Sequence, residues 1–245
     1  MHEHPLLNKI GLKHEAHSCS DCSLGDLCLP MGVSKSDLTR LESIIDARKP
    51  FQNGEAVFEE GGTFKAIYAV KSGMFKTVAL DENGTEFVKG FHLPGELVGL
   101  DAGYPEKHMS SAVSVGTSSV CAMAYDQLTA LAAQLPTLQH QLLRLFSKEV
   151  SSSQAVNMDH PAEQKLAAFL LGLSTRYKQR GYSGTQFNLS MTRRDIANHL
   201  GMAAETISRL LKRFQESGIV KIQRRELIIE DMQQLKVLAG CASVA

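Results

Sequence analysis

The chain has 245 residues, of which 43% are hydrophobic and 6% aromatic, and it contains no Trp. This composition excludes a disordered or fibrous protein, and the length allows either one large domain or two smaller ones. Lys and Arg together number 26, as do Asp and Glu, so the net charge is zero.

The charge is nevertheless unevenly distributed along the chain. Residues 160–245 hold 13 Lys and Arg against 7 Asp and Glu, a net charge of +6. Residues 1–159 hold 13 Lys and Arg against 19 Asp and Glu, a net charge of −6. A basic C-terminal part favours contact with phosphate backbones; a chance excess of a few surface charges is the alternative.

No apolar run reaches the roughly 18–20 residues that a membrane-spanning helix needs. The start of the chain, residues 1–22, has neither the apolar core nor the small-residue cleavage site of a signal peptide. We therefore expect a cytoplasmic protein with no membrane association. In that reducing compartment, cysteines are more commonly metal ligands or redox groups than structural disulfides.

The first three cysteines, Cys19, Cys22 and Cys28, follow the spacing C-x2-C-x5-C. Three thiols so close in sequence can converge on one centre, with Cys121 or Cys241 as a fourth ligand. The unequal spacing resembles iron–sulfur sites more than paired zinc knuckles. An iron–sulfur centre is therefore favoured, and a zinc site or a thiol redox switch is the alternative.

Residues 36–48 are predicted to form an amphipathic helix, because apolar residues recur on one face and Ser34 or Ser36 can cap its start. From residue 50 to residue 125, short β-like runs alternate with Gly-containing turns, two of which are Asn-Gly pairs. Asn-Gly between such runs is a strong hairpin signal. Many strands at close spacing predict a small antiparallel barrel or roll.

The apolar period becomes helical after residue 125. Residues 126–135 are predicted to form one helix, and residues 136–157 a second, longer one. Apolar residues recur along the second helix at three- and four-residue steps, which favours burial of the stripe by a symmetric partner. The residues expected at this dimer interface are Leu138, Leu142, Leu145 and Val150. Packing of the helix against its own barrel is the alternative.

The C-terminal part is predicted to contain four helices, a short strand and a hairpin. They are a helix at 162–179, a strand at 186–189, two helices around Gly201, a hairpin at 219–229 and a helix at 231–238. The two helices around Gly201 are typical of a helix-turn-helix, with Gly201 supplying a left-handed turn. The hairpin would be the wing of such a domain.

The second helix of this pair has one apolar face and one polar face. Its apolar face consists of Ile207, Leu210, Leu211 and Phe214. Glu205, Ser208 and Arg209 lie opposite, in the half of a recognition helix that meets bases. The residues expected to contact phosphates are Arg193, Arg194, Lys212 and Arg213. An αα-hairpin with a solvated polar face is the alternative.

Three pieces of the sequence together carry a family resemblance. They are the three-cysteine motif with the distant Cys121, the segment GFHLPGELVGLDA and the segment ETISRLLKRFQ. In these, the chain resembles the CRP/FNR superfamily of transcription regulators and, within it, the FNR/ANR group of oxygen sensors. The resemblance implies a 4Fe–4S cluster held by Cys19, Cys22, Cys28 and Cys121. It also implies a homodimer that binds an inverted repeat in double-stranded DNA, with RNA polymerase as a further partner.

The roll would resemble a cyclic-nucleotide-binding domain, and Gly95, Glu96 and Leu97 match that pattern. The stretch that holds the phosphate in the nucleotide-binding branch reads Lys-His-Met-Ser-Ser-Ala at residues 107–112, without an Arg to pair with the phosphate. We therefore expect no cyclic nucleotide, and we interpret Glu96 as a turn residue. An enzyme is not expected, because the sequence has no phosphate loop, GxSxG motif or His/carboxylate constellation.

The sequence thus predicts an α+β fold in which an N-terminal β-roll is joined by a long dimerisation helix to a C-terminal winged helix-turn-helix domain. The expected domains are 1–30 for the cluster, 31–135 for the sensory roll, 136–159 for dimerisation and 160–245 for DNA binding. The predicted function is oxygen-responsive regulation of transcription through a 4Fe–4S cluster, switching genes for anaerobic metabolism. The alternative is a regulator gated by a small ligand in the roll, with the cysteines binding zinc.

Overall fold

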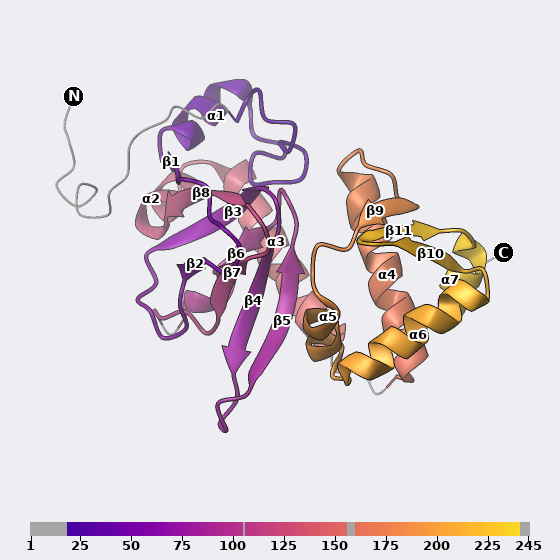
Figure 1. The fold of residues 1–245 in the computed structure, drawn as a ribbon. Coiled ribbons are helices and arrows are strands. Elements are labelled where there is room, and N and C mark those ends of the chain that lie inside the picture. The colour runs from indigo at the N-terminus through magenta and orange to yellow at the C-terminus, as the bar shows by residue number, and fades with distance from the viewer. Residues whose placement is uncertain (1–18, 105, 156–159, 241–245) are drawn as a thin grey trace. The chain divides into compact units, whose positions relative to one another are not determined.

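The computed structural model describes residues 19–104, 106–155 and 160–240 (Figure 1). The chain divides into two compact units, one formed by residues 1–79 with 91–150 and the other by residues 80–90 with 151–245. None of the helices in the described residues is both long enough and apolar enough to cross a bilayer. The predicted α+β class, with a β-sheet domain followed by a helix-turn-helix domain, is confirmed.

Two four-stranded sheets form the N-terminal part, with strand orders β1-β8-β3-β6 and β2-β7-β4-β5. The strands are β1 (Ile45–Ala47), β2 (Ala56–Phe58), β3 (Ala66–Ser72), β4 (Phe75–Leu80), β5 (Glu86–His92), β6 (Leu97–Val98), β7 (Ser111–Ser114) and β8 (Ser119–Ala124). A short 3-10 helix, η2 (Leu100–Ala102), follows β6. The strand pairs for which the register is defined are antiparallel, as the roll prediction requires.

Alternate residues of β3 belong to two different cores, because side chains alternate along a strand. Ala66, Tyr68 and Val70 lie in a core shared with residues of β2, β4 and β7, between the two sheets. Ile67 and Ala69 lie in a second core, shared with helices α1 (Lys35–Glu42), α2 (Tyr125–Ala132) and α3 (Pro136–Ala155). Among the described residues, the core between the sheets contains no cysteine.

The helix predicted at 36–48 is only partly correct. Helix α1 begins after Ser34, whose side chain accepts a hydrogen bond from the Asp37 backbone N–H at 3.2 Å, and it ends at Glu42. Ile45 instead starts strand β1, opposite Met123 of β8. The pairing with β8 overrides the helical spacing of Ile45, since the same side chain can enter the core from either conformation.

The dimer interface predicted on α3 needs correction at two positions. Leu138 is fully buried and Leu142 is 9% exposed, both in the core of their own unit, and Leu145 packs partly against that core. A side chain buried this way cannot contact a partner while its own core is intact. The alternative, packing of the helix against its own subunit, therefore holds for the first half of the predicted stripe. Val150, in the second half, is exposed.

The C-terminal unit carries the predicted helix-turn-helix. Its elements are α4 (Ala162–Gln179), β9 (Gln186–Asn188), α5 (Arg193–Leu200), α6 (Ala204–Glu216), β10 (Val220–Gln223), β11 (Glu226–Ile229) and α7 (Met232–Leu238). Strands β10, β11 and β9 form one antiparallel sheet, so the predicted wing hairpin is present. The predicted helix at 162–179 matches α4 at both ends.

The ends of α5 explain why the sequence specified this motif well. Thr192 and Asp195 form a capping box, in which each side chain accepts a hydrogen bond from the other residue's backbone N–H. Gly201 ends the helix with φ 66°, in the left-handed region that the prediction required. Ala203 is the N-cap of α6 and makes no side-chain capping bond, as its methyl group dictates.

Candidate cysteine centre and nucleic-acid interface

The cysteine segment, residues 19–33, is a chain of tight turns that precedes α1. The backbone N–H of Cys22 donates to the carbonyl of Cys19 at 3.2 Å, and that of Cys28 donates to the carbonyl of Leu24 at 3.0 Å. These local bonds fold the motif back on itself. The C-x2-C-x5-C spacing therefore brings three thiols to one side of the segment.

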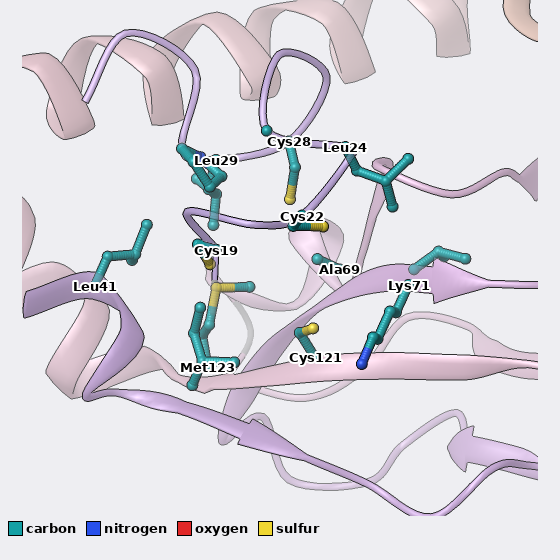
Figure 2. A pocket seen from close by; sticks show the side chains of 14 residues that line it. Cys19, Cys22, Leu24, Cys28, Leu29, Leu41, Ala69, Lys71, Cys121 and Met123 are labelled. Atoms are coloured by element: carbon teal, nitrogen blue, oxygen red, sulfur yellow. The ribbon is translucent and has the colours of Figure 1, made fainter. Parts of the chain in front are cut away.

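A pocket lies between the cysteine segment and the sheet that contains β8. The thiols of Cys19, Cys22, Cys28 and Cys121 all line it, and in Figure 2 their sulfur atoms surround one space. The pocket encloses about 430 Å³ of space not filled by protein, including the part open to solvent. Cys121 is thus placed beside the motif, whereas Cys241 lies outside the described residues.

Burial, and the charges of neighbouring thiols, make three of the pocket thiols hard to ionise. Desolvation raises the pKa of Cys19 to about 12, helped by the nearby charges of Cys121, Glu42 and Cys22. Desolvation likewise raises the pKa of Cys28 to about 12, and it raises the pKa of Cys121. Without a cation the thiols of Cys19, Cys28 and Cys121 stay protonated at neutral pH, so thiolates at these three positions require a positively charged centre.

The donor set therefore fits a thiolate-ligated metal centre. The thiols are spread around the pocket: within the part of the chain that the structure describes, no three His, Cys, Asp or Glu side chains are placed to hold one metal ion. Of the fourteen described residues that line the pocket, Lys71 alone carries a formal charge, and this charge lowers the pKa of Cys121 against the larger effect of burial. A centre larger than a single metal ion would suit this spread arrangement of thiols.

The cysteine segment is anchored to its unit at several points. Leu29, 1% exposed, packs in the same core as Leu138 and Leu142 of α3. The Glu42 side chain of α1 accepts hydrogen bonds from the backbone and hydroxyl of Ser20, at 3.1 and 3.0 Å. These contacts fix the segment against two helices at once.

The turn after β5 also touches the segment. Gly95 has φ 88°, and a Cβ at this position would lie 3.0 Å from the Cβ of Leu27. Only glycine combines that backbone conformation with so close an approach. The Glu96 carboxylate accepts the backbone N–H of Leu93 at 3.0 Å, which agrees with its interpretation as a turn residue.

Two residues of this region, Lys71 and Gln141, were not predicted from the sequence to have a role. Ala69 lies opposite Cys121 in the β3–β8 pair, but the pairing becomes irregular after Val70, so alternation along β3 does not assign Lys71 to a face. Lys71 and Cys121 nevertheless line the same pocket, a relation that only the structure reveals. Gln141 did give one signal in the sequence, because it is a glutamine among the apolar residues of a predicted helix. A side-chain amide buried there requires a hydrogen-bond partner.

Helix α6 places the predicted base-reading residues together on its exposed face. Glu205, Ser208 and Arg209 are exposed, opposite the buried face of Ile207, Leu210, Leu211 and Phe214. The Ser208 hydroxyl donates to the carbonyl of Ala204 at 3.0 Å, so it is held close to the helix. The predicted reading face is therefore dominated by the side chains of Glu205 and Arg209.

The predicted phosphate-contacting residues fall into two groups. Arg193 and Arg194 are exposed at the start of α5. Lys212 pairs with Glu216 at 3.7 Å within α6, and Arg213 pairs with Glu163 of α4 at 2.7 Å. Arg213 consequently has a structural partner that the sequence did not reveal.

Replacing Arg193 or Arg194 by Ala is expected to weaken DNA binding equally on all sequences. The slope of the logarithm of the binding constant against the logarithm of the salt concentration should become shallower by about one unit for each lost phosphate contact. Titrations of labelled duplexes at several salt concentrations measure this slope. Lys212→Ala and Arg213→Ala test the second group, and an unchanged slope for Arg213→Ala would assign that residue to the α4–α6 ion pair. Unchanged slopes in all four variants would remove them from the interface.

Two family models match the chain, each in one part. The model of the cyclic nucleotide-binding domain matches residues 48–134, and that of the Crp-like helix-turn-helix domain matches residues 164–238. The two matches fall on the two-sheet part and on the helix-turn-helix part.

Curated proteins are similar over nearly the whole chain. The transcriptional activator protein Anr of Pseudomonas protegens is 42% identical over 235 residues, 95% of this chain and 96% of that protein. The fumarate and nitrate reduction regulatory protein of Yersinia pestis is 41% identical over 241 residues, 97% of this chain and 96% of that protein. Among solved structures, FixK2 from Bradyrhizobium japonicum is 25% identical with a TM-score of 0.73, covering 81% of this chain and 99% of that one.

Proposed function

Because this chain belongs to the FNR/ANR group of the CRP/FNR superfamily of DNA-binding transcription regulators, we propose that its DNA binding is controlled by a 4Fe–4S cluster held by Cys19, Cys22, Cys28 and Cys121. The observation that carries the proposal is the shared pocket, where Cys121 from β8 meets three thiols from the N-terminal motif. The relatives, a transcriptional activator and a fumarate and nitrate reduction regulatory protein, support a role in anaerobic gene control.

The cluster, when bound, supplies a centre that oxygen can degrade. The chain's own residues do the rest: four thiolates tie the cysteine segment to the sheet, and Leu29 carries the segment onto α3. An ordered segment and an ordered α3 thus depend on each other. Through this contact, loss of the cluster to oxygen would change the dimerisation equilibrium.

We place the dimer interface on the outer face of α3. Leu143 and Val150 are exposed by 62% and 60%, and they lie seven residues apart, with Phe146 between them. This i, i+3, i+7 spacing forms one stripe on a helix. Of the four residues predicted from the sequence, Val150 keeps that role, and Leu143 and Phe146 replace the buried leucines.

In the proposed complex, each protomer of a homodimer places α6 in the major groove of one half-site. Two recognition helices must be about 34 Å apart to meet both halves of an inverted repeat, which a monomer cannot achieve. Glu205 and Arg209 would read bases, since carboxylates accept from cytosine and guanidinium groups fork onto guanine. RNA polymerase is the further partner that transcription activation requires.

The described roll supports a regulator that takes no cyclic nucleotide. Glu96 closes its own turn onto Leu93, and His108, from the stretch where the phosphate would lie, is 3% exposed and stacks on Phe58 at 3.7 Å between ring centroids. A small-ligand regulator with zinc-bound cysteines is the second candidate function, and thiol chemistry alone does not separate it from the first.

Protein purified without oxygen is expected to be brown and to contain iron and acid-labile sulfide in equal amounts. A visible spectrum with iron, sulfide and zinc assays on the same sample tests this directly. Air should bleach the colour and shift the protein from dimer to monomer in sedimentation. A colourless protein with bound zinc and no sulfide would refute the cluster and favour the zinc alternative.

A further inference from the structure

Gln141 is a buried polar side chain in an apolar part of α3. It is 5% exposed, and its Nε2 donates to the backbone carbonyl of Cys28 at 3.3 Å. The same carbonyl also accepts the backbone N–H of Met31 at 3.2 Å, so both of its lone pairs are used. Burying a side-chain amide is unfavourable unless it is hydrogen-bonded, and here the partner is the peptide of a cysteine that lines the pocket.

The bond lies within a longer contact between α3 and the cysteine segment. Leu138 and Leu142 of α3 share a core with Leu29, and the Arg144 side chain donates to the Met31 sulfur at 3.2 Å. One side of α3 is thus in contact with residues 28–31. The opposite side carries the exposed Leu143 and Val150 with the half-buried Phe146 between them, so a shift of the helix moves both sides together.

We propose that Gln141 is the positioning residue through which ligation of Cys28 sets the pose of α3. The thiol and the carbonyl of Cys28 belong to one residue, so fixing the sulfur in the pocket restrains the carbonyl that Gln141 binds. When the thiol is released, that carbonyl can move and the buried amide loses its partner. Because an unpaired buried amide is unfavourable, α3 would rotate or shift until the amide is hydrogen-bonded again. This proposal rests on the proposed function, since it assumes that a cluster ligates Cys28.

The test compares Gln141→Leu with Thr137→Leu. Thr137 is an exposed polar residue of α3 one turn before Gln141, and its position on the helix lies away from the stripe of Leu143 and Val150, so the control adds a leucine outside both contacts. The dimer dissociation constant is measured by sedimentation for cluster-loaded and metal-free protein, with iron and sulfide content read on each sample. One hydrogen bond is worth about a 3- to 10-fold change in an equilibrium constant, and the dimer contains two copies of it. The ratio of the dimer dissociation constants of metal-free and cluster-loaded protein is therefore expected to fall by about 10- to 100-fold in Gln141→Leu. The iron content should stay at the wild-type level.

The outcomes distinguish failure of the proposed function from failure of the role of Gln141. Wild-type protein without iron and sulfide, or with dimerisation that ignores the cluster, would overturn the proposed function and this inference with it. Wild-type coupling retained in Gln141→Leu, or lost equally in Thr137→Leu, would overturn the role of Gln141 alone. Loss of iron in Gln141→Leu would mean that this side chain serves cluster binding instead, and would likewise overturn it.

A second variant and a measurement on unaltered protein cover the case in which Gln141→Leu does not fold. Gln141→Asn keeps the amide but shortens its reach by one methylene, and it should lose the coupling in the same way. In wild-type protein, backbone amides of residues 138–145 should exchange hydrogen more slowly with the cluster bound than without it. Equal exchange in the two states would overturn the proposal whatever the variants do.

Discussion

Serine in place of Cys121 is expected to remove the cluster and, with it, tight binding to an FNR-type operator. Cys121 is the pocket cysteine that comes from β8, so its thiolate would be the tie between the cysteine segment and the sheet. A serine hydroxyl is a hard, weakly acidic oxygen donor, poorly suited to replace a soft thiolate on iron. Operator affinity should fall by roughly 10³-fold or more, toward the non-specific level. Anaerobic iron and sulfide content and operator affinity, measured on the same preparation, check both parts.

The other cysteines supply matched comparisons for this result. Cys19→Ser, Cys22→Ser and Cys28→Ser are expected to behave like Cys121→Ser, because all four thiols line one pocket. Cys241→Ser is expected to keep both iron and operator affinity. Full iron and full affinity in Cys121→Ser, or loss of both in Cys241→Ser, would show that the ligand set is wrong.

Alanine in place of Arg209 or Glu205 is expected to cost roughly 1–3 kcal/mol of binding free energy on the cognate operator, and to relax specificity at one base pair. Both side chains are exposed on the reading face of α6, and neither contributes to its buried face. Competition titrations with matched and singly mismatched half-sites measure affinity and discrimination together.

Gln215→Ala is the control for this experiment. Gln215 is exposed on α6, but it lies in the C-terminal half of the helix, whereas the N-terminal half of a recognition helix meets the bases. Its effect should stay within about 0.5 kcal/mol, as for an ordinary surface substitution. If Arg209→Ala discriminated mismatched half-sites as well as wild-type protein does, the docking assigned to α6 would be wrong.

The C-terminal unit was the most predictable part of the chain, because its signals are local. A capping box at Thr192, a left-handed glycine at position 201 and a clean apolar face on α6 each act within one or two helical turns. Local rules of this kind hold whatever the rest of the chain does. The glycine turns of the two sheets were predictable for the same reason.

The parts that could not be predicted depend on contacts between distant residues. Ile45 has a helical spacing but pairs with Met123, and a pattern within one segment carries no information about such a partner. Helix α3 has apolar residues on two sides, and its sequence does not say which side enters its own core. Cys121 was predicted as a fourth ligand from the family resemblance and from its place in the roll, because a lone cysteine in a strand gives no signal of its own.

The division of the N-terminal part into two cores has a consequence for how the protein is made in the cell. The core between the two sheets contains no cysteine among the described residues, so the packing of this core requires no bound metal. If the proposed cluster forms, the cysteine segment would join strands whose inner core is already packed, and iron delivery would be the last step of maturation. Loss of the proposed cluster would likewise leave this core intact, so the same molecules could be reloaded with iron instead of being degraded and resynthesised.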